Sequence, residues 1–350
     1  MLRRLTTTTT LTMTLLVTGT ATAWACGSLI GPNGAVNLLR TTTLAAYHNG
    51  IEHYVTSFEY AGAEGNFGSI VPLPDEPTKV ERGGDWTLQR LQREVAPPVA
   101  EFAAADGFVA LRSSAEVILK TKIDALDITI LKGGADEVVT WARGNGFDLP
   151  LDTPEIIGFY ADRSPYFMAA KFDAAEASRR GQGLGDGTPI HLTIPTDDPW
   201  VPLRILAAAK GSDAPVNADV FLLTDRRPIT LPAPINAADG RAIASPALTL
   251  DRSGWASASL LDDLRSDKGM GWVASDMWLS YVRVDGTASQ IDFDLAIDVT
   301  GASPSPVDAG IGDLIIDVVR ETETAWPYAI TLSVVLALAL IVLRGRALPA

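Results

Sequence analysis

The side chains best suited to acid–base or metal chemistry are three histidines, His48, His53 and His191. Their spacing contains neither a His-x-His pair nor the HExxH pattern that sets two imidazoles on one helical face around zinc. His48 is expected in a turn, and His53 in the strand that follows the turn. We therefore predict structural roles for the histidines, and neither a metal site nor a cofactor.

Clustered carboxylates are the second group of candidates. They could hold calcium, which takes about six to eight oxygen ligands, or could act as the two acids of a glycosidase. They are Asp197–Asp198, Asp262–Asp263 and the ladder Asp292, Asp294 and Asp298. The sequence has no Asp-x-Asp-x-Asp-Gly loop. Because aspartates that alternate along a strand are typical of a solvated face, the ladder is predicted to face water.

Nucleophilic catalysis has no recognisable motif. No Gly-x-Ser-x-Gly elbow occurs, and Cys26 is the only cysteine, so no intrachain disulfide can form. Whether Cys26 is lipidated or is an exposed thiol stays open. The run Gly181–Gly187 lacks the Lys and Ser/Thr of a phosphate loop, and we predict a hairpin connection there.

Tryptophans leave two interpretations open, sugar stacking and core packing. Outside the apolar ends of the chain they are Trp86, Trp141, Trp200, Trp255, Trp272 and Trp278. Their helical and strand spacing favours core packing.

The N-terminal end of the chain predicts export. Arg3 and Arg4 precede an uncharged, moderately apolar run, and Ala23-Trp24-Ala25 is a small-x-small cleavage site. We therefore expect a signal peptide over residues 1–25.

The C-terminal end predicts a membrane anchor. Residues 325–343 carry no charged side chain, and at about 1.5 Å per residue they would cover roughly 28 Å of a bilayer core of about 30 Å. Arg344 and Arg346 mark residues 344–350 as a short cytoplasmic tail. The predicted location is the cell membrane, single-pass, with the N-terminal domain outside.

Residues 26–300 are expected to form the extracytoplasmic domain, either as one unit or as two fused subdomains. A chain of this length buries about 75% of its unfolded surface. Residues 301–324 are predicted to be a linker and an amphipathic helix. The net charge of −14 disfavours nucleic acid as a partner. The expected partners are the lipid bilayer, through the C-terminal helix, and another membrane or envelope protein.

Within the domain, alternating apolar residues and turn residues predict mostly strands. A hairpin is expected where Thr41–Tyr47 and Ile51–Tyr60 flank Asn49-Gly50, a pair suited to a type I′ turn. Glu116–Leu131 is expected to be one bent strand or two, with Asp124 and Asp127 on the bend. The other predicted strands are Phe67–Leu73, Tyr166–Phe172, Pro189–Ile194, Val201–Ala209, Ala218–Leu223, Trp272–Val284 and Ile291–Val299. Their short connections predict antiparallel pairing.

Helices are predicted in three places. Asp85–Val95 has apolar residues at helical spacing. Asp136–Arg143 is followed by Asn145-Gly146, which suits a left-handed cap. A third helix is expected to begin at Thr153-Pro154, with the threonine as its cap.

Three segments in order carry a family resemblance. They are VVTWARGNGFDLP, which includes Trp141, Asn145 and Phe147; SPYFMAAKF; and PIHLTIPTDDPWVPLRI, which ends in Pro202-Leu203-Arg204. From about Cys26 to Pro234 the chain resembles the secreted bacterial family catalogued as domain of unknown function 2330. The resemblance implies a signal peptide, an extracytoplasmic domain and often a C-terminal span, and it brings no activity and no functional residue.

The sequence therefore predicts an α+β, predominantly antiparallel ectodomain with one C-terminal transmembrane helix. Because no catalytic motif is found, a non-catalytic binding or envelope-structural module is favoured. The alternative is a hydrolase of envelope glycans whose paired carboxylates only the fold would bring together. A deep pocket with two carboxyls about 5–10 Å apart would favour the hydrolase, and a shallow pocket beside an exposed apolar patch would favour binding.

Overall fold

The computed structural model describes residues 29–30, 37–61, 68–95, 116–147, 149–173, 176, 179–180, 188–237 and 243–311. The predicted signal peptide, Cys26, the Gly181–Gly187 run, the helix expected after Ile311 and the predicted span at 325–343 all lie outside these residues. None of the helices that the described residues form has the length and apolar character to span a bilayer.

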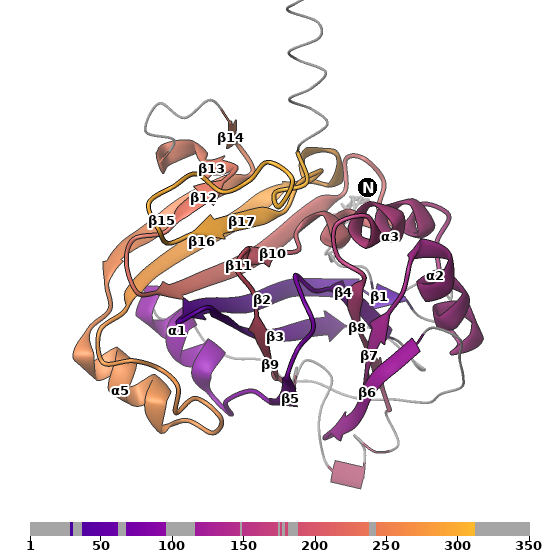
Figure 1. Cartoon of the computed structure of the whole chain (residues 1–350), viewed down its shortest axis with the longest axis horizontal. Coiled ribbons are helices and arrows are strands. Elements are labelled where there is room, and N and C mark those ends of the chain that lie inside the picture. The colour runs from indigo at the N-terminus through magenta and orange to yellow at the C-terminus, as the bar shows by residue number, and fades with distance from the viewer. Residues whose placement is uncertain are drawn as a thin grey trace, which may run out of the picture.

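A seven-stranded sheet runs through the middle of the molecule, in the order β15-β16-β11-β2-β3-β9-β5 (Figure 1). Its strands are β2 (Asn37–His48), β3 (Ile51–Ala61), β5 (Lys79–Arg82), β9 (Ile190–Pro195), β11 (Pro215–Thr224), β15 (Leu248–Trp255) and β16 (Trp278–Thr287). The predicted β2–β3 hairpin is confirmed. Asn49 and Gly50 have φ angles of 52° and 75°, as a type I′ turn requires.

Pairing in this sheet departs from the antiparallel prediction at one place. β2 and β11 are parallel, with Ala218 beside Thr41. Parallel neighbours need a long crossover connection. Here the described chain forms four of the five strands of a second sheet and three α-helices between them. The prediction was wrong because it considered only the short connections.

One face of the seven-stranded sheet is covered by α1 (Thr87–Val95) and α5 (Ala258–Ser266), seen at the lower left of Figure 1. Leu91 and Leu264 of these helices pack against Leu44 and Phe221 of the sheet in one buried cluster. The predicted helix at Asp85–Val95 is thus confirmed, whereas α5 has no counterpart among the predictions.

The other face packs on a five-stranded antiparallel sheet in the order β1-β4-β8-β7-β6. Its strands are β1 (Leu29–Ile30), β4 (Gly68–Pro72), β6 (Glu116–Ile123), β7 (Leu126–Lys132) and β8 (Tyr166–Phe172). The Glu116–Leu131 segment is two strands. Their turn lies at Asp124 and Ala125, so Asp127 belongs to β7 rather than to the bend.

Two helices pack on this smaller sheet, α2 (Ala135–Gly144) and α3 (Thr153–Ala161). Gly146 has a φ of 80°, which confirms the left-handed cap after α2. The expected cap of α3 is wrong. Asp152 precedes the helix, and Thr153 Oγ1 is buried without a hydrogen-bond partner among the residues that the structure describes.

A three-stranded sheet and short turns complete the fold. They are β10 (Trp200–Val201), β12 (Ile229–Leu231), β17 (Leu295–Asp298), the pair β13 (Ala233–Pro234) and β14 (Ala244–Ser245), and the 3₁₀ turns η1 (Arg204–Ala207), η2 (Ile235–Ala237) and η3 (Ala288–Gln290). The predicted strand Val201–Ala209 is wrong beyond Val201, because the Leu203 and Arg204 amides donate to a side chain, Asp294, and not to a strand. Overall the α+β, mostly antiparallel class is confirmed.

Candidate functional site

One face of the β6–β7–β8 meander carries a group of charged side chains. Pairing sets Lys120 opposite Thr129 and Lys122 opposite Asp127, and it sets Asp127 opposite Lys171. Directly opposed residues project from the same face of a sheet. Three lysines therefore gather on the face of the smaller sheet that turns away from the seven-stranded sheet.

The C-terminal end of α2 supplies an aromatic wall beside this face. Asn145 ends the helix, with its Nδ2 donating to the Trp141 carbonyl at 2.7 Å. Gly146 then reverses the chain in the left-handed region, where glycine is favoured. This turn brings the Phe147 ring to 5.9 Å from the Trp141 ring.

A cavity of about 470 Å³ lies between the aromatic wall and the charged face. We call it the lysine–tryptophan cavity. It is lined by Lys120, Thr121, Lys122, Asp127, Ile128, Thr129, Trp141, Asn145, Phe147, Ala169 and Lys171. Its volume falls within the range of about 300–1,000 Å³ that small-molecule sites occupy.

The Trp141 indole is the unusual group in this lining. Its side chain is only 3% exposed, and Nε1 is buried with no hydrogen-bond partner among the described residues. A buried donor left unsatisfied costs about 1–3 kcal/mol. A ligand acceptor that reached Nε1 would remove this cost.

Lys171 lacks part of the solvation that its charge requires. Its Nζ donates to the Asn145 carbonyl and lies 5.8 Å from the centre of the Phe147 ring. Burial lowers the pKa of Lys171, and the nearby Asp127 carboxylate offsets this only in part. An anion beside Lys171 would stabilise the charged ammonium.

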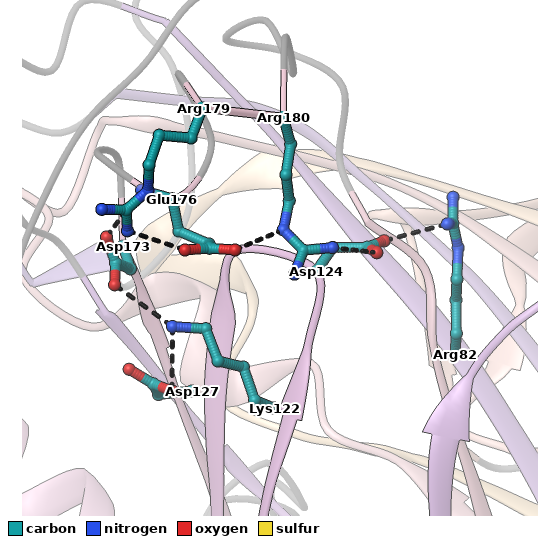
Figure 2. Close-up of polar contacts among 8 residues, drawn as sticks. All are labelled: Arg82, Lys122, Asp124, Asp127, Asp173, Glu176, Arg179 and Arg180. Atoms are coloured by element: carbon teal, nitrogen blue, oxygen red, sulfur yellow. Dashed lines mark hydrogen bonds and ion pairs between the residues drawn. The ribbon is translucent and has the colours of Figure 1, made fainter.

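Lys122 is neutralised by the protein itself. Its Nζ lies 3.6 Å from Asp127 and 3.2 Å from Asp173 (Figure 2). Lys120, in contrast, is exposed and has no ion-pair partner within the ranges that the structure describes. The unsatisfied positive charge of the cavity therefore comes mainly from Lys120 and Lys171.

Next to the cavity, a second set of ion pairs fixes the β6–β7 turn. Asp124 lies 3.0 Å from Arg82 and 3.5 Å from Arg180. Glu176 bridges Arg179 and Arg180 at 2.7 Å each, as Figure 2 shows. These arginines face carboxylates already, so the network positions the hairpin and adds no free charge to the cavity.

The lining of the cavity is poorly suited to hydrolysis. Asp127 is its one carboxylate, and this group pairs with Lys122. The two-carboxyl arrangement of a glycosidase is therefore missing from the lining. A buried indole donor, two lysines and an aromatic wall instead suit a ligand with an anionic group and an apolar part.

The predicted histidine candidates are partly brought together. His53 Nδ1 and His191 Nε2 lie 3.0 Å apart in the interior, and the Trp272 ring stacks on His53 at 3.8 Å. Burial lowers the pKa of His53 to about 3 and that of His191 to about 4. No cluster of metal-ligating side chains occurs in the described part of the chain. His48 lies apart, against Asp225.

The aspartate ladder is where the prediction of a solvated face fails. Asp294 is 0% exposed. Its carboxylate accepts hydrogen bonds from Tyr160 Oη at 2.7 Å, from an Arg163 guanidinium nitrogen and from the Leu203 and Arg204 amides. The reason is that β17 begins only at Leu295, so the alternation assumed for 291–299 does not hold at Asp294.

The remaining predicted carboxylates are scattered. Asp197, Asp198 and Asp262 are exposed, while Asp263 pairs with Arg90. Glu52, which sequence analysis did not single out, is 0% exposed, and neither of its carboxyl oxygens has a hydrogen bond of good geometry. Burial raises the pKa of Glu52 to about 8, and the Trp200 backbone opposes this only in part.

The tryptophans divide between the two interpretations. Trp141 and Trp200 are buried, as the core prediction requires, but Trp255 is 58% exposed and packs edge-on against Trp278. Sequence analysis treated Trp141 as core and Asn145-Gly146 as a cap. The signal that it missed was the alternation of Lys120 and Lys122 in a strand, which puts both charges on one face.

Comparisons with known proteins bear on identity more than on mechanism. No curated protein matches the chain. A mutated baculovirus P35 after caspase cleavage matches with 9% identity over 74% of this chain and 99% of that chain, at a TM-score of 0.40. Baculovirus P35 itself matches with 9% identity over 75% and 97% of the two chains, at a TM-score of 0.37. Similarity at this level carries no argument about the present chain.

The family comparison is of a different kind, because it covers most of the described fold. The model of the family described as uncharacterized proteins conserved in bacteria, DUF2330, matches residues 20–239. These residues include every residue that lines the lysine–tryptophan cavity. The resemblance seen in the sequence is confirmed, and the chain belongs to the DUF2330 family.

Proposed function

We propose that this chain is a non-catalytic binding module that takes up the anionic group of a ligand in the lysine–tryptophan cavity. The observation that carries the proposal is the buried Trp141 indole, whose Nε1 has no partner among the described residues. Lys171 and Lys120 stand in the same lining. Together they place one neutral donor and two cations in the lining of one cavity.

Charge complementarity supports an anion over other ligands. The chain as a whole carries a net charge of −14, so a cavity lined by three lysines and one carboxylate is a local exception. Hydrogen bonds to charged groups contribute about 1.5–3 kcal/mol each. Two such contacts and the indole bond would be enough for a micromolar to millimolar complex, which corresponds to about 4–8 kcal/mol.

The setting that we propose for this module is the outer side of the cell membrane. Its support is the sequence alone: the export signal over residues 1–25, the apolar segment 325–343 and the arginines Arg344 and Arg346 after it. Protease added to intact spheroplasts should then cut α1 and leave a tag after Ala350 intact. Digestion of the tag alone would reverse this orientation.

The binding function can be tested by calorimetric titration of the full chain with N-acetylglutamate, benzoate and inorganic phosphate. We expect saturable binding of at least one probe, and about tenfold weaker binding to Lys171→Met, since one lost charge contact is worth about 1.4 kcal/mol or more. The methionine keeps the apolar stem of the side chain in place.

The matched control is Lys268→Met, which removes an exposed lysine outside the cavity. It should bind the probe like the unmodified chain. Equal weakening by both substitutions would mean that only the overall charge matters, and the absence of binding by all three probes would remove the proposed function.

A further inference from the structure

The lysine–tryptophan cavity opens beside a strand edge with which no other described strand pairs. β6 is the last strand of the five-stranded sheet, and among the described strands it pairs with β7 alone. Figure 1 shows β6 at the outer end of that sheet. Lys120, Thr121 and Lys122 of this strand also line the cavity. An open edge offers backbone donors and acceptors to an added strand.

The hairpin geometry decides which backbone groups of β6 are free. The turn has two residues, Asp124 and Ala125, and Asp124 has a φ of 52°. Ile123 and Leu126 flank it as opposed partners. In a two-residue hairpin the flanking pair exchanges hydrogen bonds, and bonded and non-bonded pairs then alternate along the ladder.

Counting back from the turn, the bonded residues of β6 are Ile123, Thr121 and Leu119. Lys122 and Lys120 fall at the non-bonded positions, so their N–H and C=O groups point away from β7, toward the open edge. The side chains of these two lysines project into the cavity. Each lysine therefore offers a free backbone N–H and C=O together with a positively charged side chain.

The features that keep edge strands from pairing with other chains, charged side chains and bulges, protect only part of β6. Lysines protect strand edges from other chains of like charge, but they attract an acidic strand. A bulge interrupts the β6–β7 register between Val117 and Leu119, while the register from Leu119 to Ile123 is regular. The regular part is the part that borders the cavity.

We infer that the ligand of the lysine–tryptophan cavity is an extended acidic segment of a protein, which pairs with β6 as an added strand. Its backbone bonds to Lys120 and Lys122, and one of its carboxylates enters the cavity beside the ammonium groups of these two lysines. This inference rests on the proposed function and narrows its ligand to a peptide. In such strand addition, backbone bonds supply affinity and side-chain pockets supply specificity.

Hydrogen exchange of individual backbone amides tests the pairing directly. The probe is the peptide acetyl-Val-Glu-Val-Glu-Val-Glu-Val-amide, added to the full chain. In the free chain the Lys120 and Lys122 amides should exchange faster than those of Thr121 and Ile123. The peptide should slow exchange at Lys120 and Lys122 at least tenfold, and N-acetylglutamate should not.

Two further probes separate this inference from the proposed function. The same peptide with every amide N-methylated keeps its carboxylates but cannot pair, so it should bind no tighter than N-acetylglutamate. Polygalacturonate, a carboxylate polymer without amides along its chain, should also bind no tighter than N-acetylglutamate. On the protein, Lys120→Pro should lose more peptide affinity than Lys120→Met, because only the proline also removes the edge N–H.

Each outcome decides one of the two proposals. If N-acetylglutamate binds and the peptide binds no tighter, or leaves the Lys120 and Lys122 amides unprotected, the strand-addition inference falls and the proposed function stands. Tighter binding of the N-methylated peptide or of polygalacturonate than of the plain peptide would also overturn the inference. If neither N-acetylglutamate nor the peptide binds, both proposals fall.

Discussion

Two polar clusters, one around Asp294 beside α3 and one in the lysine–tryptophan cavity beside α2, differ in how completely the protein supplies hydrogen-bond partners for their buried polar groups. Around Asp294, every polar partner comes from the chain: Tyr160, Arg163 and two backbone amides converge on one carboxylate. In the lysine–tryptophan cavity the Trp141 indole, which belongs to the lining, has no such partner among the described residues. The first cluster fastens the three-stranded sheet to α3. The second has the chemistry of a site that a ligand completes.

The largest change in the free energy of unfolding is expected from a substitution in the Asp294 cluster. Asp294→Ala leaves the nearly buried Arg163 guanidinium without its carboxylate, and loss of one partner of a buried ion pair costs about 3–5 kcal/mol. Chemical denaturation should report this drop in the free energy of unfolding. Asp292→Ala is the matched control, since Asp292 is exposed and should change stability by less than about 0.5 kcal/mol. Equal effects of the two substitutions would contradict the role given to Asp294.

Glu52 extends the comparison, because it is fully buried and its carboxyl oxygens have no hydrogen bond of good geometry among the described residues. Its pKa is raised from 4.5 to about 8 in the folded chain, so below pH 4.5 both states are protonated and the stability is complete. As the pH rises toward 8, the unfolded state loses its proton first and is favoured. Glu52→Gln should remove this loss, worth roughly 3 kcal/mol at pH 7.

The measurement for Glu52 is the free energy of unfolding between pH 4.5 and 8, compared for Glu52→Gln and the unmodified chain. The difference between the two should grow as the pH rises. A difference that stays constant with pH would show that Glu52 does not hold a proton in the folded state.

The histidine pair should give a pH dependence of the opposite sign. The folded-state pKa values of about 3 for His53 and about 4 for His191 lie below the ordinary 6.5. The contribution of the neutral pair to the free energy of unfolding is therefore complete above pH 6.5. It is lost as the pH falls toward 4, because the unfolded state takes up protons first. Glu81, 3.4 Å from His191 Nδ1, limits the loss by stabilising the charged form.

Substitution of the pair tests this sign. His191→Gln should flatten the decline of unfolding free energy between pH 6.5 and 4 by about 2–3 kcal/mol, as follows from a pKa lowered from 6.5 to about 4. His48→Gln is the control, because His48 lies outside the pair. A decline in His191→Gln as steep as in the unmodified chain would contradict the neutral, buried pair.

The smallest effect on stability is expected inside the cavity. Lys171→Met keeps the stem of a half-buried side chain and removes a charge that burial disfavours. The free energy of unfolding should change by less than about 0.5 kcal/mol, in either direction. A loss as large as that of Asp294→Ala would mean that the cavity lysines hold the fold together, and the contrast between the two clusters would disappear.

Local signals in the sequence predicted much of the fold but little of the site. The hairpin at Asn49-Gly50 and the cap at Gly146 could be predicted because each depends on a few adjacent residues with special backbone angles. The parallel contact of β2 with β11 could not, since it depends on where a long excursion of the chain returns.

The site depends on contacts that are distant in sequence. Lys120 and Lys171 meet only because β6, β7 and β8 form a meander, and Trp141 joins them only because α2 ends over that meander. The Asp294 ladder misled for the same reason: alternation indicates a solvated face only when the strand extends through the residue. The tertiary fold decides both cases.

The most direct test of the account observes the Trp141 indole itself. The chain has eight tryptophans, so a full chain labelled with ¹⁵N on the indole nitrogens gives few enough signals to assign the Trp141 resonance by its absence in Trp141→Phe. Titration with N-acetylglutamate should move this resonance downfield in a saturable manner, as its N–H gains an acceptor, while the Trp255 signal stays in place. A Trp141 signal that does not move at saturating probe, or that moves equally in Lys171→Met, would contradict an anion site in this cavity.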